Sequence, residues 1–264
     1  MQTMVRATRS ASRNARLTEA VATGPLGALS HDELGVIFDG LADPLQPVIA
    51  VALSSTCLGL RTPLWAALEV LKERHERAKS LCRKIETSCA ALRDAKSLQW
   101  SDKGLTADDM ATLAMILRTN GLPSLQDLRS RANSFGEAGV QALSEGLASG
   151  APPLRRLELY QNGVGPAGAA ALAAALSRDV LPKLEMLGIY STSLGQQGVA
   201  ALVAPLCKLP ALAVLVLGKC KIGDEGVASL VAKPGQRRLQ GAQVPLPQRQ
   251  QDHRRRHGHP SRCS

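Results

Sequence analysis

Aromatic residues are nearly missing from this 264-residue chain: they make up 2 % of it, whereas hydrophobic residues together make up 45 %. Leucine and alanine must therefore fill most of the core. No run of about 18 apolar residues occurs, so we expect no membrane-spanning helix. The first 20 residues contain four arginines and no acid before Glu19, and they lack the apolar stretch of a secretory signal. We interpret them as a disordered tail, with an organelle transit peptide as the alternative.

Recognisable catalytic and metal-binding patterns are also missing. The six cysteines form no C-x-x-C pair and no other spacing typical of a metal site. We interpret them as reduced thiols of a cytoplasmic or nuclear protein. The sequence has no phosphate-binding loop, and no nucleophile lies at a recognisable spacing from a base. We therefore expect a non-enzymatic protein without a metal or cofactor.

The positive charge is confined to the two ends of the chain. Of the net +10, residues 1–20 contribute +3 (four arginines, one glutamate) and residues 233–264 contribute +7 (eight Lys/Arg, one aspartate). The remaining 20 basic and 20 acidic residues cancel. The part expected to fold is therefore not basic, and nucleic-acid binding gains little support outside the ends.

A segment of about 30 residues recurs along the second half of the chain. Four copies begin at Leu125, Leu154, Leu184 and Leu212. A less regular copy precedes them, with Leu98 lying one repeat before Leu128. Each copy joins a short L-x-L strand pattern to a small-residue helix pattern, as in LELYQNGVGPAGAAALAAAL. Neither part can bury its apolar face alone, so the copies must stack.

Three kinds of position recur in these copies. Alternating strand leucines should point inward, and the polar column after each strand should bond the backbone of neighbouring turns. Gly165 and Gly168 should let the chain turn and bring the helix close to the strand. Ser130 replaces an inward leucine and predicts a weakly packed second repeat. The columns are Leu128, Leu157, Leu187 and Leu215; Asn133, Asn162, Thr192 and Cys220; and Gly139, Gly168, Gly198 and Gly226.

The pattern LxxLxLxxN followed by GxxGxxxL resembles the ribonuclease-inhibitor type of leucine-rich repeat, over about residues 95–232. The resemblance implies an α/β fold: a short curved solenoid with parallel strands inside and helices outside. Thr192 and Cys220 depart from the asparagine column, although the family tolerates cysteine there. The resemblance also implies that the concave strand face binds a protein partner.

The residues between the inward leucines should line this concave face. They include both tyrosines of the chain, which fall in one column of neighbouring copies. Tyrosine and arginine are favoured binding anchors, so we take this face as the candidate partner site. The alternative is a set of solvated strand residues with ordinary cross-strand packing. The candidate residues are Arg129, Arg131, Arg155, Glu158, Tyr160 and Tyr190.

Residues 25–94 are predicted to be all-α. The stretch from 29 to 61 reads as short amphipathic helices with a break at Pro44 and Pro47. Its characteristic residues follow in the order Leu29, Asp32, Leu34, Ile37, Phe38, Leu41, Leu45, Val51, Cys57 and Leu60. This order resembles an F-box, a small module that docks on the adaptor of a cullin-type ubiquitin ligase. Ser30 stands where that family usually has proline, and its usual late tryptophan is missing. The resemblance implies adaptor contacts by Leu29, Leu34, Ile37, Phe38 and Leu41; the alternative is a helical cap on the first repeat.

A long helix should then begin at Thr62–Pro63. Its apolar residues alternate by four and three, which is the spacing of a heptad seam. Histidine, alanine and two cysteines weaken the seam, so we expect it to pack on the solenoid end rather than form a coiled-coil dimer. His75 should be partly buried and not catalytic. The seam is Leu64, Leu68, Leu71, His75, Ala78, Cys82, Ile85, Cys89 and Leu92.

After Val231 the repeat pattern ends in a tail rich in proline, glutamine and arginine, which reads as disordered. Read one base later, however, the codons for 244–258 are compatible with Y-L-Y-L-N-D-N-K-I-T-D-A-G-M-A. Those for 236–243 are compatible with S-D-D-F-K-A-L-K. We hypothesise a one-base frameshift near Pro234, which sequencing of the transcript tests.

These observations divide the chain into a basic N-terminus (1–24), a helical F-box-like or capping segment (25–94), about five leucine-rich repeats (95–232) and a basic tail (233–264). The leading hypothesis is a substrate receptor of a cullin-type ubiquitin ligase. The alternatives are a GTPase-activator-like or nucleotide-sensor-like regulator, and a plain scaffold with a helical cap.

Overall fold

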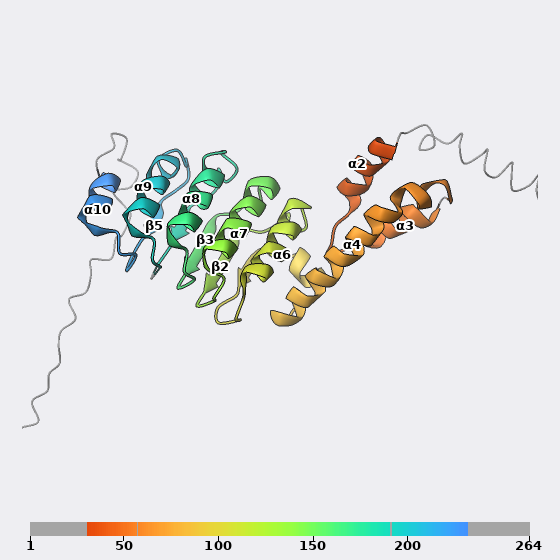
Figure 1. Cartoon of the computed structure of the whole chain (residues 1–264), viewed down its shortest axis with the longest axis horizontal. Coiled ribbons are helices and arrows are strands. Elements are labelled where there is room, and N and C mark those ends of the chain that lie inside the picture. Colours follow the sequence, from red (N-terminus) through yellow and green to blue (C-terminus); the bar gives the residue numbers. More distant parts are fainter. Residues whose placement is uncertain (1–30, 57, 191, 232–264) are drawn as a thin grey trace, which may run out of the picture.

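The computed structural model describes residues 31–56, 58–190 and 192–231 (Figure 1). The helices are α2 (His31–Leu41), α3 (Val48–Thr56), α4 (Leu58–Lys84), α5 (Cys89–Arg93), α6 (Ala107–Arg118), α7 (Gly136–Gly150), α8 (Gly165–Leu176), α9 (Gly195–Leu206) and α10 (Gly223–Val231). The strands are β1 (Ser97–Gln99), β2 (Asp127–Arg131), β3 (Arg156–Tyr160), β4 (Met186–Gly188) and β5 (Val214–Val216). Both tails, including Leu29 and the proposed frameshift, lie outside the described residues. Within the described part, no helix is both long and apolar enough to cross a membrane.

The five strands form one parallel sheet in sequence order, β1-β2-β3-β4-β5. Each strand is followed by a helix, and helices α6 to α10 stack in a second layer beside the sheet (Figure 1). Leu128, Leu157, Leu187 and Leu215 are direct partners on adjacent strands. The predicted α/β solenoid is therefore confirmed, including the alignment of its leucine column.

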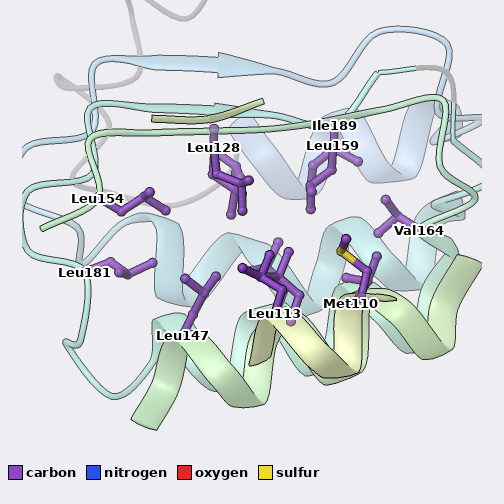
Figure 2. Packing of buried hydrophobic residues seen from close by; sticks show 14 of the residues in the cluster. Met110, Leu113, Leu128, Leu147, Leu154, Leu159, Val164, Leu181 and Ile189 are labelled. Carbon is purple, nitrogen blue, oxygen red and sulfur yellow. The ribbon is translucent and has the colours of Figure 1, made fainter. Parts of the chain in front are cut away.

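The strand leucines and the helix residues close over one continuous core. Leu128 and Leu159 point from the strands toward Leu113 and Met110 on the helix side (Figure 2), and each of the four is at most 1 % exposed. Burying a leucine side chain contributes roughly 1.5–3 kcal/mol. This repeated contribution, and not any aromatic cluster, holds the two layers together.

The asparagine column forms the predicted hydrogen-bond ladder behind the strands. The buried Asn133 amide accepts from the Leu105 N–H at 3.0 Å and donates to the Trp100 carbonyl at 2.6 Å. Asn162 accepts from the Asn133 N–H at 2.8 Å and donates to the Ser130 carbonyl at 2.8 Å. Each side chain thus satisfies backbone groups of the preceding repeat that have no strand partner.

The two departures from asparagine keep part of this ladder. The Cys220 thiol donates to the Ile189 carbonyl at 2.8 Å and lies 3.8 Å from the Thr192 hydroxyl. Ser130 is also part of it: this residue is 1 % exposed, and its hydroxyl accepts from the Asn133 side chain at 2.9 Å. The expectation of weak packing at Ser130 is therefore wrong, because a hydrogen bond takes the place of a leucine side chain.

The turn glycines separate into two roles. Gly165 opens α8 with a φ of 58°, and Gly136, Gly195 and Gly223 do the same in their repeats, so the predicted turn at Gly165 is confirmed. Gly168 is different. A Cβ there would lie 3.1 Å from Val140 Cβ on α7. The missing side chain of Gly168 therefore lets α8 pack closely on the preceding helix α7, and not on the strand.

The N-terminal helices form a separate small cluster, joined to the repeats by α4. The first half of α4 packs against α2 and α3, while Ala78, Leu81 and Ile85 in its second half belong to the solenoid core. The predicted bounds of the long helix are wrong: α4 begins at Leu58 and not at Thr62–Pro63, and it ends at Lys84, so Cys89 and Leu92 of the seam lie on α5. The part of the seam on α4 packs inside the chain, as expected, and the second half of α4 covers the first repeat. The core of the small cluster is Leu34, Phe38, Ala42, Ala50 and Leu71.

Ion pairs and a hydrogen bond hold the N-terminal segment in place beside the first repeat. Lys84 at the end of α4 pairs with Asp109 at 2.5 Å, and Arg93 pairs with Asp43 at 2.6 Å. Burial tends to raise the pKa of Asp109, but the bonds from Lys84 and Thr106 outweigh it and leave that pKa lowered. His75 donates through Nδ1 to the Pro44 carbonyl at 2.7 Å and is partly buried, as predicted.

Candidate protein-binding surface

The strand register assembles one face of the sheet from alternate residues. Arg129, Glu158, Gly188 and Val216 are consecutive cross-strand partners, and Arg131 is paired with Tyr160. These side chains point away from the buried leucines because successive residues of a strand alternate between faces. The face is therefore open to solvent, and we call it the concave face.

The two tyrosines meet on the concave face. Their ring centroids are 6.0 Å apart with an interplanar angle of 74°, which is an edge-to-face arrangement. The Lys219 amine lies over the Tyr190 ring, 5.8 Å from its centroid, within the range of a cation–π contact. Two half-buried aromatic rings and a cation thus form a continuous patch across three repeats.

Gly188 makes room for this patch. A Cβ at Gly188 would overlap Cε1 of Tyr160 and lie 2.6 Å from its hydroxyl oxygen. The Tyr160 ring therefore lies across the strand β4 backbone and covers the glycine. The sequence analysis did not identify this role of Gly188. The available signal was a residue without a side chain in the column next to that of the two tyrosines.

Three charged residues, Glu158, Arg156 and Arg129, lie near enough to Tyr160 to shift the pKa of its hydroxyl. The Glu158 carboxylate lies 3.9 Å from Arg129 Nε and 3.7 Å from Arg156 Nη1, and Arg156 also approaches Asp127 at 3.6 Å. Burial raises the pKa of the Tyr160 hydroxyl, the Glu158 charge raises it further, and the arginines oppose the shift. Tyr160 is therefore a neutral hydrogen-bond donor at neutral pH.

The structure brings together Arg129, Glu158, Tyr160 and Tyr190 of the candidate residues. Arg131 ends strand β2, exposed, and donates weakly to Gln161 at 3.4 Å. Arg155 does not share the concave column. It precedes β3 and pairs with Glu185 at 2.9 Å, and Arg156 is the arginine of β3 on the same strand face as Glu158. The sequence analysis missed Arg156, Lys219, Gly188 and Asp127.

A second surface lies on the N-terminal helices. Leu34 and Phe38 are 7 % and 1 % exposed and form the core of that unit, whereas Ile37 and Leu41 are 39 % and 36 % exposed. Neighbouring residues extend the apolar area, and we call the whole set the helical-arm surface. It consists of Val36, Ile37, Leu41, Val48, Ile49, Val51, Trp65 and Val70. These are eight of the ten exposed large hydrophobic residues in the described chain, so exposed apolar side chains are concentrated on the N-terminal helices.

No group of three or more metal-ligating side chains occurs among the described residues. Cys82 and Cys89 place their sulfurs 3.6 Å apart. Burial, with the contact to Cys89, raises the pKa of the Cys82 thiol to about 12, so this thiol is protonated and weakly nucleophilic at neutral pH.

Comparison with protein families gives one match. The model described as Leucine Rich repeat matches residues 150–173 and 210–231. The first segment covers β3 and the start of α8, and the second covers β5 and α10. The chain therefore contains leucine-rich repeats, whose stacked strands form the extended concave surfaces that such proteins use for binding. No curated protein matches the chain.

Proposed function

We propose that this chain is a non-enzymatic, cytoplasmic or nuclear protein-binding module that holds a protein partner on its concave face. The observation that carries the proposal is the Tyr160–Tyr190 pair, 6.0 Å apart on the open side of the sheet. The core is filled by leucines and does not use either ring. The repeat length of about 30 residues further supports a repeat of the ribonuclease-inhibitor type.

The chemistry of the patch suits a protein partner. Tyrosine offers a large rigid contact area at low entropy cost, and its hydroxyl adds a hydrogen bond. Arginine beside it adds planar donors. Residues of this kind dominate interface energies, with individual losses of about 2 kcal/mol or more on truncation.

Replacing both tyrosines, Tyr160→Ala with Tyr190→Ala, should weaken partner binding at least about 30-fold, because two anchors are lost. The partner is first identified by photo-crosslinking from a reactive amino acid at position 190, with position 141 on helix α7 as the control site. Affinity is then measured with the purified partner. Gly188→Ala should weaken binding as well, since it displaces the Tyr160 ring without removing it.

The matched control is Arg118→Ala with Glu145→Ala, an exposed ion pair on the helix layer. It should leave both stability and affinity unchanged. Equal affinity of the double tyrosine variant and the unaltered chain would remove the concave face from consideration.

We propose that the helical-arm surface docks on the adaptor of a cullin-type ubiquitin ligase, which makes the chain a substrate receptor. What supports this is the F-box-like order of its apolar residues together with the exposure of Ile37, Val48 and Trp65 at 39, 68 and 62 %. Leu34 and Phe38 would then hold the helices together, and Ile37 and Leu41 would make the contact.

The full chain should capture the purified adaptor, and Ile37→Asp with Val48→Asp should abolish the capture because both residues are exposed in this surface. Circular dichroism checks that the fold is kept. Val227→Asp on helix α10, 44 % exposed, is the matched control and should bind normally. A folded chain that does not capture the adaptor would leave the plain scaffold, in which α4 serves only as a cap.

A further inference from the structure

The last described repeat presents an uncovered edge. Strand β5 stands at the end of the sheet and pairs only with β4 among the described strands. Val214 on β5 and Val227 on α10 are 36 % and 44 % exposed, and they are the only large exposed hydrophobic residues described outside the helical-arm surface. At the other end of the sheet, Leu81 and Ile85 of α4 cover the first repeat. Strand β5 and helix α10 thus lack a covering element such as α4 among the described residues, and they resemble a repeat from the interior of the stack.

The sequence that follows is compatible with a further repeat in another reading frame. Read one base later, the codons for 244–258 permit Y-L-Y-L-N-D-N-K-I-T-D-A-G-M-A. Its two leucines fall at positions 245 and 247, one repeat length after Leu215 and Leu217. The asparagine, isoleucine and second-column glycine, at 250, 252 and 256, fall at the same interval after Cys220, Ile222 and Gly226.

At two positions the genetic code leaves little choice in the shifted frame. The shifted codon spanning Gln250 and Gln251 encodes only asparagine or serine, and that spanning Asp252 and His253 encodes only isoleucine or threonine. In the printed frame, the two inward strand positions hold Pro245 and Pro247, and proline cannot donate to a strand ladder. The shifted frame permits the pattern of the solenoid, which the printed frame lacks.

We propose that the outer edge of β5 and the adjoining face of α10 are the docking surface for one further leucine-rich repeat, Y-L-Y-L-N-D-N-K-I-T-D-A-G-M-A, encoded one base out of frame behind this segment. Its leucines would continue the column that ends at Leu215, and its asparagine would supply the amide that bonds the turn after β5, as Asn162 does for Asn133. Its two tyrosines would follow Val214 and Val216 on the concave face.

The test compares three chains. The first is the chain as printed. The second carries S-D-D-F-K-A-L-K followed by the shifted repeat in place of residues 236–258. The third is the same as the second, except that the two strand leucines and the isoleucine of the new repeat are serines. The third chain keeps length and charge but cannot pack its strand on the core.

The second chain should unfold at least about 3 °C above the other two, and amide exchange at Leu215 and Leu217 should slow at least about tenfold in it alone. Equal midpoints and equal exchange in all three chains would overturn the docking surface. Sequencing of the transcript tests the encoding separately: an added or missing base near Pro234 supports it, and an intact printed frame overturns it.

Discussion

Gly146→Ala is expected to destabilise the solenoid by about 3 kcal/mol, although alanine favours helices over glycine. Gly146 lies in the interior of α7, where a Cβ would be 2.5 Å from the Cα of Ala114 and 3.1 Å from its carbonyl oxygen on α6. Backbone atoms of a packed helix cannot rotate away, so the two helices must separate. Urea unfolding followed by circular dichroism measures the loss.

The matched control for this prediction is Gly35→Ala in α2, where nothing lies within 4 Å of the added carbon. This change should stabilise the chain by about 0.5–1 kcal/mol through helix propensity alone. If Gly146→Ala behaved like Gly35→Ala, the close contact between α6 and α7 would be refuted.

Asn133→Ala is expected to cost about 3 kcal/mol. It leaves the Leu105 N–H and the Trp100 carbonyl without their side-chain partner, and an unsatisfied buried backbone group costs roughly 1–3 kcal/mol. The effect should appear as a lower urea midpoint with an unchanged slope. Gln161→Ala, at a nearby exposed position, should stay within about 0.5 kcal/mol of the unaltered chain.

A cysteine in the same column offers a further comparison. Asn133→Cys should be milder than Asn133→Ala, because Cys220 shows that a thiol can donate to a strand carbonyl in this fold. An Asn133→Ala variant as stable as the unaltered chain would mean that water replaces the amide and that the ladder contributes little.

The repeats could be predicted from the sequence because each column encodes one physical requirement. Leucine at every second strand position requires a buried side, and a recurring asparagine requires a turn with unpaired backbone groups. Their alignment on adjacent strands followed from the spacing alone. The same reasoning failed at Ser130, because a single substitution can be compensated by a neighbour, here the Asn133 amide, that lies in another column.

The concave site was predicted less completely, since it depends on contacts between repeats. The tyrosines were identified by their column, but the place of Gly188 under Tyr160 depends on the direction in which the ring lies. Arg155 was taken for a concave residue, although alternation from the inward Leu157 points to Arg156 on that face and Arg155 precedes β3. In the helical segment, an amphipathic pattern could not say which of Phe38 and Ile37 would be buried.

Helix α4 has a geometric consequence beyond its packing. Its 27 residues span about 40 Å, with one half built into the arm and the other into the first repeat (Figure 1). It therefore acts as a rigid spacer. Its length sets the distance between the N-terminal helices and the repeats, and its helical twist sets their relative rotation about the helix axis. One inserted residue would turn the arm by about 100° relative to the repeats, whereas seven would restore the original rotation to within about 20° and add about 10 Å.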